Sequence, residues 1–365
     1  MYMGVYMKKK KNKNSKFMKF KLMIKDEHRF NIMLMVAFFI GVLFIFCTYA
    51  WFYASLNVRV EFFNMVVTNN SGLFVSLDGI DYGSSVEISR DSLFNNLNDK
   101  YPNHTNQWAS RGLFGVSTNG LSSPTNSKFD VYTATEISYR GEGNRKRYIT
   151  TELSSEDKPN TANVYVAFDL FLKNVSGSPY TDNLYLADGT SIYFEDEETD
   201  SYADGSLNSM RIGIVKMGST SSKSDINTIQ NLTCDDTCEM LIFEPNNTSH
   251  SDESIERAKK YGITIKKGEA MPTYAVIKER ENLIFESGHE GTGYPLDTEH
   301  LKLQETITST SMEDPIFEIP NGVTKVRIYV WIEAQDVDSL ETRPKGAEIA
   351  IVINFFKDLA GYYKG

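Results

Sequence analysis

The sequence predicts a mainly β protein, an exported β-sandwich or jelly-roll-like domain preceded by one N-terminal transmembrane helix. Three observations predict it. A basic head is followed by a long uncharged apolar stretch, the chain beyond it alternates apolar and polar residues, and turn-forming residues recur at short intervals. We therefore divide the chain into a basic cytoplasmic segment (1–29), a transmembrane helix or signal-anchor (30–56) and an extracellular β-sandwich domain (57–365).

The charge distribution predicts the orientation in the cell membrane. Residues 1–29 hold nine Lys and one Arg against two acids, Asp26 and Glu27, and no charge occurs from Phe30 to Val58. The whole chain carries −10, so the part beyond the head is strongly acidic. Basic flanks of membrane helices stay cytoplasmic, which predicts a cytoplasmic N-terminus and an extracellular C-terminal domain. The acidic exterior argues against nucleic acid as a partner, because phosphate binding needs clustered Lys and Arg.

The apolar stretch has two interpretations. Ile32–Ala54 is long enough to span a membrane, which takes ~20 residues, and its end carries the aromatic residues of an interfacial belt, Tyr49, Trp51 and Tyr53. Alternatively, the basic head, the apolar core and Thr48-Tyr49-Ala50 form a signal peptide cleaved after Ala50. We favour the retained anchor, because the basic head is long for a signal peptide.

Strands are predicted wherever the period is two. Three long stretches alternate, Val164–Lys173, Lys325–Glu333 and Glu348–Phe356, each with one dry and one mixed face. Shorter candidates are Val58–Val67, Leu73–Leu77, Leu184–Leu186, Ile192–Phe194, Met210–Val215 and Met240–Phe243. Turn pairs such as Asp78-Gly79 and Asn321-Gly322 separate them, since these residues tolerate positive φ.

Helix is sparse in the predicted domain. Asp252–Tyr261 (residues 252–261) is the clearest case, with acids in its first turn, Lys259 and Lys260 in its last, and Gly262 after it. Ser92–Leu97 is a shorter candidate. Two stretches rich in polar residues and glycine are predicted to be loops, Lys100–Lys128 and Asn282–Thr310.

The cysteines favour a disulfide. Cys47 lies in the apolar stretch, whereas Cys234 and Cys238 form the sequence CDDTC in the exported part, where disulfides are permitted. A metal site with Asp235 and Asp236 is the rival. Two thiols without a second Cys or His pair make a weak zinc site, so we prefer the Cys234–Cys238 bridge.

No catalytic constellation is recognisable, and we expect a non-enzymatic protein without a cofactor. His289-Glu290 lacks the second His of a zinc-protease helix, since position 293 is Gly. We expect His28, His104 and His250 to be solvated. The best candidates for a divalent ion, calcium, are Asp336 and Asp338, which leave a well-defined strand together. The competing interpretation of these acids, of Glu333 and of the group around Glu195–Glu198 and Asp200 is a solvated edge.

Two further features suggest a polymer ligand. Arg145-Lys146-Arg147 could hold an anionic glycan or wall polymer, but we favour a solvated hairpin tip, because three charges alone rarely define a site. Tyr329 and Trp331 lie on the wetter face of their predicted strand, where they could bind a glycan. Packing between sheets is the interpretation that we favour for both rings.

Several stretches occur in an order that resembles a family of exported, membrane-anchored proteins of low-GC Gram-positive bacteria: Thr48–Phe52 (TYAWF), Ser55–Val58, Gly72–Gly79 (GLFVSLDG), Tyr165–Leu172 (YVAFDLFL), Leu184–Leu186, Met210–Gly213, Phe243–Asn246 and Val326–Asp338. This family is distantly similar to the TasA and camelysin group of surface proteins, whose export is linked to a dedicated signal peptidase. The resemblance implies a jelly-roll domain and fibre assembly by donated strands. The similarity to camelysin implies a metallopeptidase. This sequence, however, has no recognisable set of metal ligands, and no catalytic residue of that group can be assigned to a position in it. Members of this family usually have Glu-Gly at the position where this chain has Glu333-Ala334, which is a small departure from the pattern.

The leading hypothesis is a non-enzymatic cell-surface structural or interaction protein that is anchored by its N-terminal helix and assembles with like subunits. Val58–Val67 follows the apolar stretch directly, and a freed strand there could extend a neighbour's sheet. A glycan- or cell-wall-binding module is the alternative, and a metal-dependent hydrolase ranks last.

Overall fold

The computed structural model describes residues 31–42, 59–67, 72–109, 113, 115–122, 129–133, 146–150, 165–176, 181–194, 207–235, 238–260, 266–270, 273–276, 282–289, 292–295, 301–308, 310, 314–333, 336–340 and 348–359. The chain forms two units, Met1–Ala54 and Ser55–Gly365. Each unit is described by itself below.

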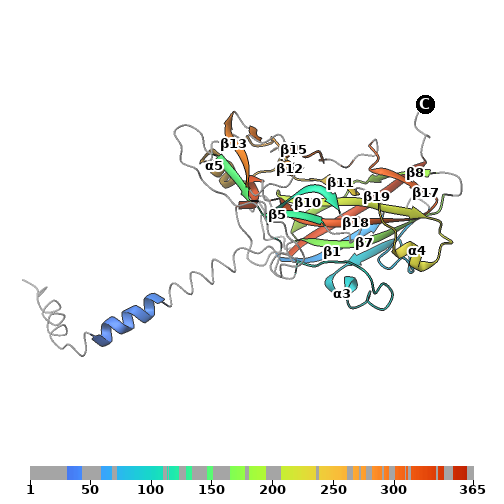
Figure 1. The fold of residues 1–365 in the computed structure, drawn as a ribbon, viewed down its shortest axis with the longest axis horizontal. Helices are drawn as coiled ribbons and strands as arrows, with labels where there is room; N and C mark the ends of the chain where they lie inside the picture. The colour runs from blue at the N-terminus through green and yellow to red at the C-terminus, as the bar shows by residue number, and fades with distance from the viewer. Residues whose placement is uncertain are drawn as a thin grey trace, which may run out of the picture. The chain divides into compact units, whose positions relative to one another are not determined.

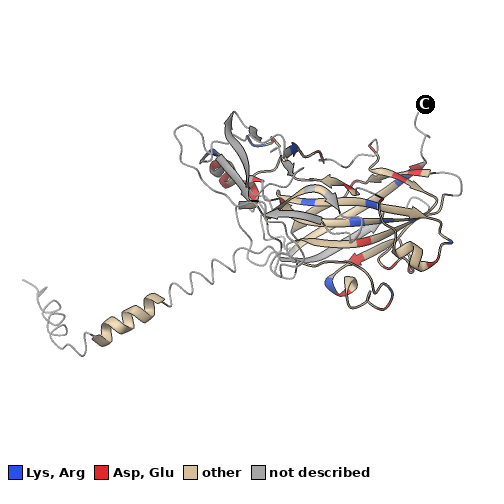
Figure 2. Ribbon diagram, viewed as in Figure 1, with Lys and Arg blue, Asp and Glu red and all other residues tan. Residues whose placement is uncertain are grey.

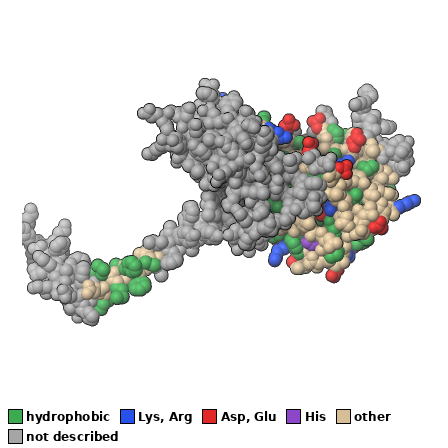
Figure 3. All heavy atoms as spheres, viewed as in Figure 1, with side chains coloured by type: hydrophobic (Ala, Val, Ile, Leu, Met, Phe, Trp, Pro, Cys, Tyr) green, Lys and Arg blue, Asp and Glu red, His purple; other side chains and the backbone are tan. Residues whose placement is uncertain are grey.

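In the first unit, residues 31–42 form a helix. Its apolar side chains are exposed, Phe38 by 67% and Leu34 by 61%, and Figure 3 shows them covering its visible face. No helix among the described residues is long and apolar enough to cross a membrane. Residues 43–54 of the predicted span and the cleavage position Ala50 lie outside the described part, so the transmembrane helix stays a prediction.

The second unit is built on two main sheets, neither of which closes on itself (Figure 1). The larger sheet has the order β2 (Leu73–Ser76), β7 (Val166–Asn174), β18 (Gly322–Glu333), β10 (Met210–Thr220), β11 (Cys238–Phe243), β4 (Gly115–Ser122) and β5 (Phe129–Thr133), with β16 (Thr306–Ile307) beside β11. The smaller sheet has the order β17 (Phe317–Pro320), β8 (Thr181–Leu186), β19 (Glu348–Leu359), β1 (Arg59–Val67) and β3 (Ser85–Ile88), with β9 (Ser191–Phe194) beside β19.

The remaining described elements are short. Two small sheets pair β12 (Tyr274–Val276) with β15 (Leu301–Leu303), and β13 (Asn282–His289) with β14 (Thr292–Pro295) and β6 (Lys146–Thr150). The helices are α3 (Arg90–Leu93), α4 (Ile226–Gln230), α5 (Asp252–Lys260) and the 3₁₀ turn η1 (Val337–Leu340). The prediction of a mainly β protein is confirmed.

One hydrophobic core joins the two main sheets. Its buried side chains come from β2, β7, β10 and β18 in the larger sheet and from β8, β17 and β19 in the smaller one. Burial of this apolar surface is the main force that holds the sheets together. The strands that contribute the largest shares of it, β7, β18 and β19, are the three that the period-two pattern predicted most clearly.

The prediction that the mixed face of β18 is the wetter one is wrong, because all 12 residues of this strand are buried. Charged side chains account for the difference. Lys325, Arg327 and Glu333 lie within or at the end of this strand and are 5% or less exposed. Figure 2 likewise shows charged positions inside strands of the second unit as well as in its loops. A polar face of a strand stays buried only where partners satisfy its charges, and those partners form the clusters described below.

Two predicted loops contain strands. Lys100–Lys128 includes β4, and Asn282–Thr310 includes β13, β14, β15 and β16. In β4 the polar composition hid a buried strand, because Ser117 is fully buried and its Oγ donates to Glu333 Oε1 over 2.6 Å. The short helix predicted at Ser92–Leu97 begins earlier. Ser89 caps it and exchanges hydrogen bonds with Ser92 in a capping box.

Candidate functional site

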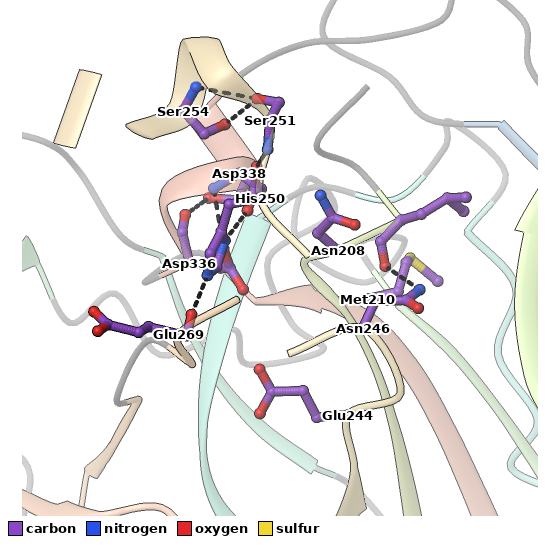
Figure 4. Close-up of polar contacts among 12 residues, drawn as sticks. Asn208, Met210, Glu244, Asn246, His250, Ser251, Ser254, Glu269, Asp336 and Asp338 are labelled. Atoms are coloured by element: carbon purple, nitrogen blue, oxygen red, sulfur yellow. Dashed lines mark hydrogen bonds and ion pairs between the residues drawn. The ribbon is translucent and has the colours of Figure 1, made fainter. Parts of the chain in front are cut away.

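A group of connected buried charges lies where β18 ends, and it is the larger of the two such groups described below. Figure 4 labels four of its members, Glu244, His250, Asp336 and Asp338. We call it the Arg211 cluster, and it consists of Arg211, Glu244, His250, Asp336 and Asp338. Arg211 projects from β10, Glu244 directly follows β11, His250 precedes α5, and the two aspartates belong to the turn that forms η1. All five side chains are buried, with exposed fractions from 0% for Arg211 to 6% for His250.

Arg211 is the centre of the cluster. Its Nη2 lies 2.9 Å from Asp336 Oδ2 and 2.5 Å from Glu244 Oε1. Its Nη1 donates to the backbone carbonyls of Asn208 and Met210. One guanidinium therefore links the end of β11 to the η1 turn and fixes both against β10. A buried arginine of this kind needs such a fan of acceptors, because its charge cannot be given up.

The two aspartates are held by backbone groups as well as by cations. Asp338 N donates to Asp336 Oδ1 over 3.0 Å, and Ser251 N donates to Asp338 Oδ1 over 3.1 Å. Asp338 Oδ2 lies 2.5 Å from His250 Nδ1. All four carboxylate oxygens thus face protein donors, and the contacts tie η1 to the residues that begin α5.

His250 sits between two acceptors, which determines its protonation. Its Nδ1 faces the Asp338 carboxylate and its Nε2 lies 2.8 Å from the backbone carbonyl of Glu269. A neutral imidazole can donate from only one nitrogen, so this geometry favours the imidazolium. Burial opposes the charge, but the Asp338 hydrogen bond and the neighbouring Asp336 outweigh it and raise the pKa of His250.

The cluster carries more acids than bases, and its pKa values reflect this. Burial raises the pKa of Glu244 to about 7 against the opposing charge of Arg211. Burial also raises the pKa of Asp336, again with Arg211 opposing and Asp338 adding to the rise. Stability of this part of the fold should therefore depend on pH near neutrality.

A metal ion fits the cluster only if a proton leaves. His250, Asp336 and Asp338 offer ligand atoms that all lie within 4.8 Å of one another. Calcium prefers six to eight oxygens, and this group offers one nitrogen and two carboxylates beside a guanidinium. Zinc accepts such a donor set, but it would have to displace the proton between His250 and Asp338. Two ion pairs, Arg211–Asp336 and His250–Asp338, are joined by the Asp338 N–H, and the imidazolium supplies a positive charge beside the carboxylates.

The solvated-edge interpretation of these acids is wrong, because Asp336 and Asp338 are 1% and 0% exposed and contact Arg211 and His250. That they bind a divalent ion stays a prediction. Glu333 is also fully buried. His250 was expected to be solvated, and it is 6% exposed. Residues 195–200 lie outside the described part of the chain.

The cysteine pair is joined in the structure. Cys234 and Cys238 form a disulfide with their Cα atoms 5.6 Å apart, at the start of β11. Asp236, part of the rival metal site, lies outside the described residues. Tyr329 and Trp331 are fully buried, so the glycan-binding role that required them to be exposed is wrong. Of the basic run, Lys146 and Arg147 begin β6, while Arg145 is not described.

A second buried ionic group, the Asp169 cluster, joins β7 to β18 nearer the other end of the larger sheet. Asp169 Oδ1 lies 2.9 Å from Arg327 Nη1, and its Oδ2 accepts from Tyr101 over 2.8 Å. Lys325 Nζ lies 3.3 Å from the same carboxylate and donates to the Gln230 carbonyl. Burial raises the pKa of Asp169, but Arg327 and Lys325 prevail and lower it. Here bases outnumber acids.

The Arg211 cluster includes residues that the sequence analysis passed over. Arg211 is a single charge inside the apolar strand Met210–Val215, and that is the one local signal that could have found it. His250 and Glu244 carry no such signal.

No family model, no curated protein and no solved structure matches the chain. Both ring nitrogens of His250 are engaged, so it cannot take a proton from a nucleophile as arranged. The cluster is thus best suited to holding strands and turns together.

Proposed function

We propose that this chain is a non-enzymatic structural protein of the cell surface. In this proposal a β-sandwich of the jelly-roll kind is held at the membrane by the N-terminal segment and assembles with like subunits through its first strand. The acidic exterior keeps such a domain soluble. The ionic clusters stiffen it without providing a reactive group.

The observation that carries the proposal is the position of β1. This strand pairs in parallel with β19, from Phe62 opposite Ala350 to Val67 opposite Phe355, and antiparallel with β3, from Phe63 opposite Ile88 to Val66 opposite Ser85. It lies inside the smaller sheet, yet it does not form a hairpin with either neighbour. The next strand in the chain, β2, belongs to the larger sheet.

A strand in this position can be exchanged between copies. Without β1, the sheet would present the unpaired backbone of β19 on one side and of β3 on the other. Unpaired edges are templates for a further strand, and an identical strand from a second copy would satisfy the same register. Because β1 starts the second unit, its release removes no other element from the fold.

The exchange is tested by supplying the strand from outside. A labelled peptide covering Arg59–Val67 is added to a protein of residues 68–365, with a scrambled peptide of the same composition as the control. We expect saturable binding of the native sequence and a rise in the melting temperature. Equal binding of both peptides, or none, would remove the strand-exchange proposal.

Membrane attachment rests on the basic head, the apolar stretch and the exposed apolar side chains of residues 31–42. Alkaline extraction of membranes, followed by N-terminal sequencing, tests it. A retained anchor stays in the pellet with the original N-terminus. A soluble fragment that begins at Trp51 would show that the stretch is a signal peptide and that β1 is freed by cleavage.

A further inference from the structure

Three side chains of matched chemistry meet in the core between the two sheets. Lys357 Nζ lies 2.7 Å from Asn174 Oδ1 and 2.8 Å from Asp182 Oδ2. The exposed fractions are 8% for Lys357 and 1% for each of the other two. We call this group the Lys357 triad. An amine, a primary amide and a carboxyl group are thus held together away from water.

The triad spans the two main sheets. Lys357 is on β19 and Asp182 is on β8, which pair in the smaller sheet, whereas Asn174 ends β7 in the larger sheet. The contact between Lys357 and Asn174 therefore connects the last strand of the chain with a central strand of the opposite layer.

The side-chain carbonyl of Asn174 is held facing the amine. Asn174 Nδ2 faces the backbone carbonyls of Ile319 and Pro320 at 3.3 and 3.4 Å, which fixes the side-chain carbonyl toward Lys357. Only an NH₂ group can face two carbonyl oxygens, and only the amide oxygen can accept from the amine. The same two carbonyls lie where ammonia would leave.

Gly72 packs beside the amine. It adopts a φ of +109°, and a Cβ there would lie in ordinary contact with Lys357 Nζ, at 3.5 Å, but only 2.7 Å from the Val175 carbonyl oxygen. A larger residue would therefore strain the backbone next to the triad.

The carboxyl group is placed to act on the proton. Asp182 Oδ1 is buried and has no hydrogen-bond partner among the described residues, while Oδ2 receives the Lys357 amine. A buried carboxylate with one unpartnered oxygen is costly as an anion. Transfer of one proton from Nζ to Asp182 gives a neutral amine and a carboxylic acid, with no change in the total number of protons.

We propose that Lys357 and Asn174 form an intramolecular isopeptide bond with Asp182 as the acid–base group. The neutral amine attacks the Asn174 side-chain carbonyl carbon, and the Nζ–Cγ bond forms. Asp182 passes the proton released from Nζ to Nδ2, the Cγ–Nδ2 bond breaks, and one ammonia leaves. The reaction exchanges one amide for another and needs no oxidant, reductant or added cofactor.

Such a bond would fasten the two sheets covalently. It would close a loop that begins at the end of β7 and ends in β19, and so would prevent the layers from separating even where strands are exchanged. The bond does not depend on the proposed assembly, because neither Asn174, Asp182 nor Lys357 belongs to β1. It would suit a protein that has to resist pulling or proteolysis.

Lys325 provides an internal comparison. It is 5% exposed and also contacts a carboxylate, Asp169. No side-chain amide carbonyl is among its contacts in the described part of the structure, and Arg327 shares the same carboxylate. Burial of a lysine is therefore not enough for this reaction. Of these two lysines, only Lys357 contacts both a side-chain amide and a carboxyl group that no second cation shares.

Peptide mapping of the purified full-length chain tests the bond. The protein is reduced, denatured and digested, and the peptides that contain Asn174 and Lys357 are sought by mass spectrometry. We expect one branched peptide whose mass is about 17 Da below the sum of the two linear peptides, the mass of one ammonia. Separate linear peptides of full mass from folded wild-type protein would overturn the proposal.

Matched variants assign the roles. Asp182→Asn preserves the volume but cannot accept the proton, and we expect full-mass linear peptides and a lower melting temperature. Asn174→Ala should give the same result. A branched peptide that persists in Asp182→Asn would overturn the acid–base role of Asp182. A loss of about 18 Da, the mass of one water, mapped to Lys325 and Asp169, with full-mass linear peptides for Asn174 and Lys357, would overturn the assignment to Lys357.

Discussion

The two main sheets of the second unit are held together in different ways. Every strand of the larger sheet comes from the stretch between Leu73 and Glu333, and its central strands carry the buried Arg211 and Asp169 clusters. In the smaller sheet the two neighbouring strands β19 and β1 come from the two ends of the unit. The larger sheet therefore combines its share of the apolar core with ion pairs between strands from the interior of the unit. The smaller sheet includes a terminal strand, β1, which is the strand that the proposed assembly would exchange.

The contrast extends to the charges. The Arg211 cluster has more acids than bases, and the Asp169 cluster has more bases than acids. Removing a partner should therefore change the pH dependence of stability in opposite directions in the two clusters. At the Asp169 cluster, the loss of the carboxylate leaves two buried cations uncompensated, which costs far more than the intact pair contributes. The predictions below follow from these differences.

The largest expected effect is at the Asp169 cluster. Asp169→Ala leaves Lys325 and Arg327 buried without their carboxylate, and we expect a loss of about 3–5 kcal/mol in the free energy of unfolding. Chemical denaturation at neutral pH measures it. Glu87→Ala, at an exposed position of β3, is the control and should change stability by less than about 0.5 kcal/mol. A change of similar size in both variants would contradict the role of the cluster.

A smaller effect should appear in the pH dependence of the melting temperature. The folded pKa of His250 is raised, so its stabilising contribution is present below the unfolded value of about 6.5 and is lost as pH rises through the folded pKa. The folded pKa of Glu244, about 7, lies above its unfolded value, so its contribution also decreases as pH rises through that range. The melting temperature should thus be higher near about pH 6 than near about pH 8.

Two histidine variants sharpen this prediction. His250→Gln should lower the melting temperature at mildly acidic pH and flatten its decline toward alkaline pH. His104 is the matched control, because burial lowers its pKa and its contribution has the opposite sign. His104→Gln should make the decline steeper. A His250→Gln variant with the wild-type pH profile would contradict the imidazolium assignment.

The smallest expected effect concerns metal ions. Since protein donors already occupy the carboxylate oxygens of Asp336 and Asp338, we expect the same melting temperature in EDTA, in calcium and in zinc. Thermal melts at about pH 8, where His250 is closest to losing its proton, make the most sensitive comparison. A rise in zinc that EDTA reverses, and that Asp338→Asn abolishes, would make the cluster a metal site.

Local sequence signals predicted the local features. The alternation in β7, β18 and β19 identified the strands that fill the core, and the close spacing of Cys234 and Cys238 suggested their bridge. The acids, base and glycine around Asp252–Lys260 marked α5. In each case the information lies within about a dozen residues, which is the range over which periodicity, caps and turns act.

The features missed depend on contacts between distant residues. β4 was predicted to be a loop because its serine and threonine are polar, and only Glu333, far along the chain, makes Ser117 suitable for burial. The pairing of β1 with β19 and the meeting of Asn174, Asp182 and Lys357 follow from the order of strands in the sheets. No local pattern specifies that order.

Hydrodynamic size tests the difference between the sheets most directly. Residues 57–365 and residues 68–365 are compared by sedimentation over a wide range of concentrations, with circular dichroism to verify that both fold. We predict assemblies that grow with concentration for the protein with β1 and a monomer at every concentration for the protein without it. A monomer in both cases, or equal assembly in both, would contradict strand exchange through the smaller sheet.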